Sequence, residues 1–195
     1  VSPNFNLGEL AQAVKGQYAI VLPSAVQALQ DLRDAAGAIN VNSGYRSPDY
    51  NAQIGGAGYS RHMYGDGFDL DPVSVTIDAL EGLCTGQGGF LVEYETHVHC
   101  DWRDTDLAVE FFGPPDAAAP PSSPPLVAEL HDEDGVWWVE HEGFDEGEPV
   151  HRWIARDGDG RVLARASGRI FVPPVDATHV ELDVGRVLVL DASID

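Results

Sequence analysis

The stretch SRHMYGDGFDLD, residues 60–71, holds two metal-ligand residue types in one short segment. His62 and Asp69 stand seven positions apart, and the two glycines between them let the backbone turn from a loop into a strand. The later segment HVHCD, residues 97–101, adds His97 and His99. A catalytic zinc ion takes three protein ligands and leaves its fourth position to water. The sequence therefore predicts a zinc site built from His62, Asp69 and either His97 or His99.

The residues around this stretch predict short helices and strands. Asn6 and Glu9 form a plausible capping box, and apolar residues recur at helical spacing after Asn6 and after the candidate cap Ser24. Ser47 and Ser74 are candidate starts of two further helices. Strands are expected at 39–42, 67–71, 90–94 and 97–102. In the second of these strands Phe68 and Leu70 share one face, so Asp69 is expected on the opposite face. This mixture predicts an α+β domain over residues 1–112.

The second half of the chain has a different pattern. GPPDAAAPPSSPP at 113–125 is typical of a semi-stiff linker. After it, apolar runs alternate with turn residues at 126–130, 136–142, 150–156, 162–167, 178–183 and 187–191. These six runs predict a small all-β domain over residues 126–195, of the immunoglobulin or fibronectin sandwich type. Alternation places one of Trp137 and Trp138 in its core and the other outside.

The charge is strongly negative, with 32 acidic against 11 basic residues and a net charge of −21. Lys15 is the only lysine. Such a composition is typical of proteins that stay solvated at high salt, where charge repulsion is screened; an acidic secreted protein is the alternative. Without a basic patch, nucleic-acid binding is not expected. No run of 18 apolar residues occurs, so no membrane span is expected.

The cysteines and the remaining histidines are less informative. Cys84 and Cys100 could form a disulfide in an oxidising compartment or remain two buried thiols, and their spacing does not decide between these. Three histidines of the second half are interpreted as surface residues rather than as a second metal site: His131, His141 and His151.

The three words SGYRSPDYN, SRHMYGDGFDLD and HVHCDWR together resemble the M15 zinc peptidases. This family includes D-alanyl-D-alanine carboxypeptidases and phage endolysins that cut peptidoglycan stem peptides, and its fold is related to the hedgehog signalling domain. The resemblance covers roughly residues 1–105, including the opening FNLGELA. Within the family pattern S-x-H-x-x-G-x-A-x-D, Gly67 replaces the usual alanine.

The resemblance implies a role for each matching residue around one Zn²⁺ ion. His62, Asp69 and His99 would be the zinc ligands, because the second histidine of H-x-H is the ligand in relatives. Arg46 would bind the substrate carboxylate or the developing oxyanion. Ser60 would hydrogen-bond the peptide, and Tyr45, in the same word as Arg46, would also contact the substrate.

The proton-handling group is less defined by the resemblance. Relatives use the first histidine of H-x-H or an acid slightly upstream, which leaves His97, Glu95 and Glu93 as candidates. The spacing E-x-x-H would place the acid at position 94 or 96, where this chain has Tyr94 and Thr96. All three candidates therefore stay open.

Two classes of function are compatible with these features. The first is a zinc metallopeptidase that cuts wall or envelope peptides through a metal-activated water, outside the cell or on a virion, with the β domain binding the surface. The second is a structural or host-binding virion protein of a virus of a halophile, which keeps the peptidase fold with weak or no catalysis and contacts other virion or envelope proteins. A hedgehog-like zinc-binding ligand without hydrolysis is a third possibility.

Overall fold

The computed structural model describes residues 2–16, 20–57, 60–103, 126–144 and 147–194. The chain divides into two compact units, one of Val1–Val92 with Thr96–Pro125 and one of Glu93–Glu95 with Leu126–Asp195. The expected linker at 113–125 lies outside the described residues. Residues 93–95, which the sequence placed in the first domain, group with the second unit because their backbone bonds to it: Glu95 N–H donates to Glu148 and Val150 N–H donates to Glu93.

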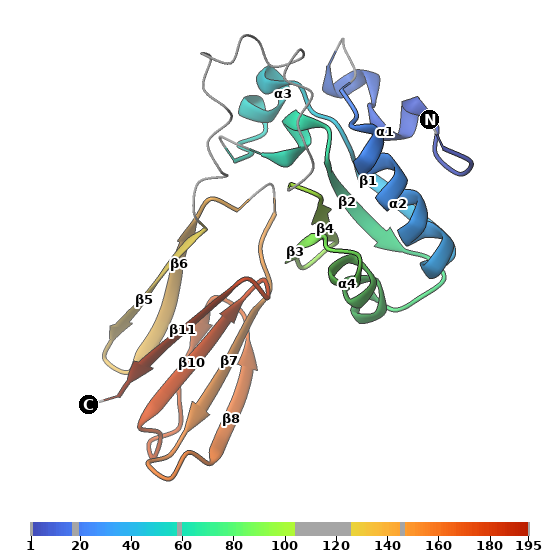
Figure 1. Cartoon of the computed structure of the whole chain (residues 1–195). Coiled ribbons are helices and arrows are strands. Elements are labelled where there is room, and N and C mark those ends of the chain that lie inside the picture. The colour runs from blue at the N-terminus through green and yellow to red at the C-terminus, as the bar shows by residue number, and fades with distance from the viewer. Residues whose placement is uncertain (1, 17–19, 58–59, 104–125, 145–146, 195) are drawn as a thin grey trace. The chain divides into compact units, whose positions relative to one another are not determined.

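The N-terminal unit alternates short helices with the strands of one sheet (Figure 1). Its elements are α1 (Leu7–Leu10), η1 (Ala13–Lys15), α2 (Pro23–Ala36), β1 (Ile39–Ser43), α3 (Pro48–Gln53), η2 (Arg61–Tyr64), β2 (Gly67–Pro72), α4 (Ile77–Gly86), β3 (Phe90–Glu93) and β4 (Val98–Asp101). Among the described residues, no helix is long and apolar enough to cross a membrane.

The helix starts test the capping predictions residue by residue. Asn6 forms the expected capping box with Glu9, and Ser47 caps α3. The other two predictions were wrong. Helix α2 begins at Pro23, whose fixed φ suits the first helical position, and helix α4 is capped by the Thr76 side chain instead of Ser74. The Ser74 hydroxyl accepts a hydrogen bond from the Ala38 N–H at 2.9 Å.

The four-stranded sheet has the order β1-β2-β4-β3, with β1, β2 and β4 antiparallel. Helices α2 and α4 pack against it (Figure 1), and Phe68, Leu70, Val98 and Cys100 point from the sheet into the shared core. The expected strand phase is confirmed, because Asp69 and His99 alternate with these core residues and therefore share the opposite face.

A disulfide between Cys84 and Cys100 joins α4 to β4 beneath the sheet. The two Cα atoms are 6.3 Å apart and both residues are fully buried. The choice that the sequence left open is thus decided in favour of the disulfide, which is expected in an oxidising compartment.

Reduction of this disulfide is expected to lower the free energy of unfolding of the N-terminal unit by about 3 kcal/mol, because a closed loop of about 15 residues restricts the unfolded chain by that amount. Urea unfolding with and without a reductant, followed by circular dichroism, measures the loss. The C-terminal unit has no cysteine and provides the internal control. An unchanged N-terminal transition in reduced protein would contradict the expectation.

The C-terminal unit is all β among its described residues, with two antiparallel sheets (Figure 1). The first has the order β11-β10-β7-β8 and the second β5-β6-β9. The strands are β5 (Val127–Glu133), β6 (Val136–Glu142), β7 (His151–Arg156), β8 (Val162–Ser167), β9 (Ile170–Phe171), β10 (His179–Val184) and β11 (Leu188–Ser193). All six expected runs form strands. The two-residue strand β9 was missed because it is too short to show alternation.

The two sheets of this unit share a core. Alternate residues of β7 and β10 are buried, and the Trp153 ring of one sheet stacks on the Phe171 ring of the other with centroids 5.4 Å apart. Trp137 is buried, whereas Trp138 is partly exposed and stacks on His131, as the alternation predicts. The immunoglobulin or fibronectin assignment stays a prediction.

Candidate metal centre

Three segments of the N-terminal unit bring His62, Asp69 and His99 together. In the antiparallel register of β2 and β4, Asp69 lies directly opposite His99, so both side chains project from the same face of the sheet. His62 lies on η2, where the Ser60 hydroxyl accepts the His62 backbone N–H and fixes the start of the turn. Strand alternation and a capped turn thus aim three ligand residues at one point.

One nitrogen of each histidine lies close to the same carboxylate oxygen of Asp69. Asp69 Oδ1 lies 3.1 Å from His62 Nε2 and 2.9 Å from His99 Nδ1. The three atoms lie within 4.8 Å of one another, and all three residues are buried. Two imidazole nitrogens and one carboxylate oxygen form a donor set that suits zinc and leaves a fourth position open. The residues present therefore fit a catalytic zinc ion.

Outer hydrogen bonds fix which nitrogen of each histidine can bind metal. His62 Nδ1 lies 2.7 Å from the carbonyl oxygen of Gly44, which can only accept, so Nδ1 carries the proton and Nε2 offers its lone pair. His99 Nε2 lies 3.1 Å from Asp101 Oδ2, which leaves His99 Nδ1 for the metal. Gly44 itself has to be glycine, since a Cβ there would lie 2.1 Å from the Leu10 carbonyl oxygen.

The electrostatics of the metal-free site follow from these contacts. Burial alone would raise the pKa of Asp69, but His62, His97 and His99 hold that pKa well below its ordinary value. Burial lowers the pKa of His99, yet its bonds to Asp101 and Asp69 outweigh this and raise the pKa to about 10. A metal ion must displace that proton when it binds His99.

Arg46 lies against the ligand Asp69. Its Nη2 donates to Asp69 Oδ2 at 2.6 Å and its Nε donates to Ser43 Oγ at 2.8 Å, and the side chain is only 1% exposed. The guanidinium therefore holds the second carboxylate oxygen and leaves Oδ1 toward the two histidines. In this structure Arg46 is a positioning residue, and its expected contact with substrate stays a prediction.

The structure buries the two other expected substrate-binding residues. Ser60 is 3% exposed and Tyr45 is 5% exposed. The Tyr45 backbone N–H donates to the Leu10 carbonyl, and burial raises the pKa of the phenol. Both residues shape the loops that carry Arg46 and His62, and their contact with a peptide stays a prediction.

Among the three proton-handling candidates, the structure brings His97 to the ligand cluster. His97 Nε2 lies 3.5 Å from Asp69 Oδ1, and the side chain is 12% exposed. Its Nδ1 lies 2.9 Å from the Thr96 hydroxyl, which orients the ring. His97 therefore combines proximity to the ligands with access to solvent.

The two glutamates belong to the other compact unit. The Glu93 carboxylate pairs with Arg152 and, at 2.8 Å, with Arg186. Although burial would raise the pKa of Glu93, these two guanidinium groups lower it, which makes Glu93 a poor base. Glu95 is exposed, and its backbone N–H bonds to Glu148.

Two supporting residues, Asp101 and Ser43, were not predicted from the sequence. Asp101 is fully buried, and its carboxylate bonds to His99 and to Arg103. Burial would raise the pKa of Asp101, but these two bonds lower it to about 2. Period-two spacing after His97 and His99 was the available signal for Asp101. Ser43 faces Asp69 in the register of β1 and β2, which only the pairing reveals.

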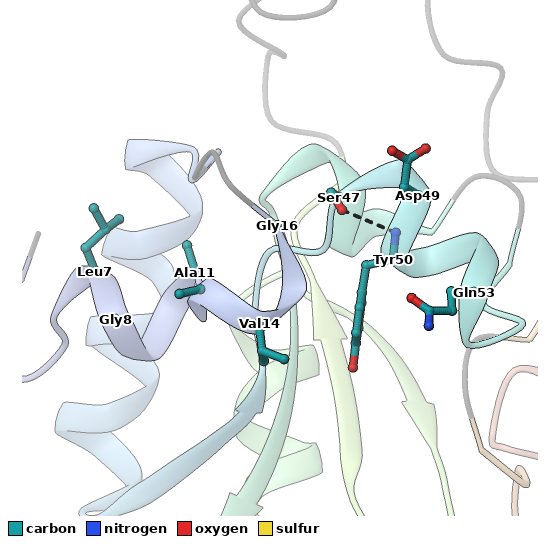
Figure 2. Close-up of a pocket in the computed structure, with 10 residues that line it drawn as sticks. Leu7, Gly8, Ala11, Val14, Gly16, Ser47, Asp49, Tyr50 and Gln53 are labelled. Atoms are coloured by element: carbon teal, nitrogen blue, oxygen red, sulfur yellow. Dashed lines mark hydrogen bonds between the residues drawn. The ribbon is translucent and has the colours of Figure 1, made fainter.

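A hollow of about 810 Å³ lies on the surface formed by α1, η1 and α3 (Figure 2). Leu7, Ala11 and Val14 make one wall apolar, and Tyr50 projects beside them. Ser47, the residue after Arg46, contributes to the other wall. The chain segment that carries Arg46 thus continues directly into the lining of this hollow.

The donor set is that of a zinc site, and comparison with known proteins identifies the family. The sequence profile of the peptidase M15 family matches residues 3–101, so the chain belongs to this family. The zinc D-Ala-D-Ala carboxypeptidase of Streptomyces albus G is 44% identical over 62 residues, which cover 31% of this chain and 24% of that enzyme. The match thus spans about a quarter of the relative's length. No solved structure matches the chain.

Proposed function

We propose that this protein is a zinc-dependent peptidase that hydrolyses cell-wall or envelope peptides containing D-amino acids. The observation that carries the proposal is the convergence of His62 Nε2, Asp69 Oδ1 and His99 Nδ1 in one buried cluster of the family domain. The name of the carboxypeptidase relative supports a D-Ala-D-Ala terminus as the first substrate to test. An L-Ala-D-Glu bond, cut in an endolysin manner, is the second.

The chemistry divides between the ion and the chain. Zinc held by His62, Asp69 and His99 would supply Lewis acidity for the scissile carbonyl and for a water molecule. His97 accepts the proton of the attacking water and returns it to the leaving amine, a function that usually contributes about 10²–10⁴-fold. Arg46 keeps Asp69 oriented throughout, because its guanidinium holds Oδ2 of the carboxylate.

The substrate and the second unit complete the proposal. The hollow lined by Ser47, Asp49 and Tyr50 offers apolar and polar contacts for the peptide that leads to the scissile bond. The all-β unit serves as a module that binds the cell surface or a neighbouring envelope protein. Both roles place the protein outside the cytoplasm, where its disulfide is stable.

The test uses the full chain saturated with zinc and two synthetic peptides. One peptide ends in D-Ala-D-Ala and the other contains an internal L-Ala-D-Glu bond, and mass spectrometry identifies the products. We expect cleavage of one peptide, loss of cleavage with a chelator, and recovery when zinc is restored. A zinc-loaded, folded protein that cuts neither peptide would overturn the proposal.

A further inference from the structure

The C-terminal unit contains a second cluster of metal-ligand side chains, formed by His141, Glu148 and His151. His141 lies on β6, His151 is the first residue of β7, and Glu148 precedes β7. One ligand atom from each lies within 4.8 Å of the others. Both histidines were predicted to be surface residues, which was wrong for His151 because it is only 2% exposed.

The burial of the His151 side chain gives independent support for a ligand at this cluster. Both of its ring nitrogens are buried and have no hydrogen-bond partner among the described residues. A buried polar group without a partner costs free energy that folding normally avoids. A buried imidazole facing a carboxylate and a second imidazole has a ready partner in a divalent metal ion, since neutral histidine is a common metal ligand.

The distances suit a small tetrahedral ion. Glu148 Oε1 lies 3.7 Å from His141 Nε2 and 3.6 Å from His151 Nδ1. Ligand atoms bound at about 2.1 Å to a tetrahedral zinc ion are separated by about 3.4 Å. Both distances lie within about 0.3 Å of this separation. The two imidazole rings stack with centroids 5.4 Å apart, which holds them side by side.

The backbone around the carboxylate is fixed. The Glu148 carbonyl accepts the Glu95 N–H at 3.0 Å, and the Val150 N–H donates to the Glu93 carbonyl at 3.0 Å. Tyr94 and Pro149 form a β-bridge at the same place. These contacts hold Glu148 next to His151, so little ordering would remain for a metal ion to impose.

Arg169 is the competing cation at this cluster. Its Nε lies 2.7 Å from Glu148 Oε1, and its Nη2 donates to His141 Nε2 at 2.9 Å. Because arginine can only donate, His141 Nε2 accepts this bond and is the unprotonated nitrogen of the ring. The same lone pair could bind a metal ion. The Arg169 side chain is 50% exposed and can turn into solvent when a metal ion takes its place.

From this geometry we propose that His141, Glu148 and His151 bind a second divalent metal ion of the zinc class. The ion joins β6, in one sheet of the unit, to β7, in the other sheet, and so cross-links the two layers. This site is separate from His62, Asp69 and His99, and it stands whether or not the protein is a peptidase.

The test measures bound zinc per chain in tag-free, full-length protein after dialysis, by elemental analysis and by calorimetric titration. We expect two equivalents in the wild type and one each in His62→Ala and in Glu148→Gln. The double variant His62→Ala with Glu148→Gln should bind none. Glu148→Gln keeps the side-chain shape, and circular dichroism verifies that it folds.

Two controls make the assignment specific. His131 and His179 also lie within 4 Å of an acid on the same unit, at 3.7 Å from Glu140 and 3.8 Å from Asp191. Among the described residues, neither pair has a third ligand residue nearby. Replacing either histidine with alanine should leave two equivalents. Arg169→Gln should tighten binding at the second site at least tenfold. A folded wild type that holds one zinc, lost entirely in His62→Ala, would overturn the second site while leaving the proposed peptidase intact.

Discussion

Asp69→Asn is expected to lose the N-terminal zinc ion and to lower peptide hydrolysis by at least about 10³-fold, since it removes the only anionic ligand. Asp69 Oδ1 faces His62 and His99, and Oδ2 accepts from Arg46. The asparagine amide is neutral, and its NH2 group can only donate a hydrogen bond. It therefore cannot replace both oxygens of the carboxylate. Zinc content and initial rates on the peptide that the wild type cleaves measure the effect.

The same change is expected to destabilise the metal-free N-terminal unit by about 3–5 kcal/mol, because it removes the carboxylate that pairs with the buried Arg46 guanidinium. Urea unfolding of the chelated protein measures this loss. Asp71→Asn is the matched control, two residues along β2 and on the same face, half-buried and outside the ligand cluster. If Asp69→Asn retained one tightly bound zinc at this site, the ligand assignment would be contradicted.

The candidate ligand residues of this site could be proposed from the sequence because strand alternation and a family motif both involve residues close together in the chain. Strand alternation placed Asp69 on the face opposite Phe68 and Leu70, and the structure agrees. The same alternation directed His97 and His99 to one side. The choice of His99 as third ligand came from resemblance to relatives, and the Asp101 bond now gives it a physical reason.

Other features depend on contacts between residues far apart in the chain, which local patterns do not encode. The Arg46–Asp69 pair joins positions 23 residues apart, and its formation requires the turn after β1 to lie against β2. The Cys84–Cys100 disulfide depends on how α4 packs on the sheet. The cluster of His141, Glu148 and His151 likewise needs the two sheets to be in place.

The missed boundaries have local causes of a different kind. Serine and threonine cap helices by the same hydrogen bond, so the sequence could not choose between Ser74 and Thr76. In the folded chain the Ser74 hydroxyl accepts a hydrogen bond from the Ala38 N–H, and the Thr76 hydroxyl caps the helix. At Pro23 the proline ring itself favours the helix start, and the residue after it is then already inside the helix.

His97→Gln is expected to lower kcat by about 10²–10⁴-fold while the bound zinc stays at the wild-type level, because a general base usually contributes about that factor. His97 Nε2 lies 3.5 Å from Asp69 Oδ1, near the ligands without belonging to the set of three, and its side chain reaches solvent. Loss of kcat with retained zinc separates a proton-handling role from a ligand role.

The two glutamates provide the contrast. Glu93→Gln is expected to keep kcat within about twofold, because the wild-type carboxylate is occupied by Arg152 and Arg186 and its lowered pKa makes it a weak base. Glu95→Gln distinguishes the remaining candidate. If kcat collapsed in Glu95→Gln and survived in His97→Gln, the proton would be handled by the exposed carboxylate of Glu95, and the role of His97 would be reduced to supporting Asp69.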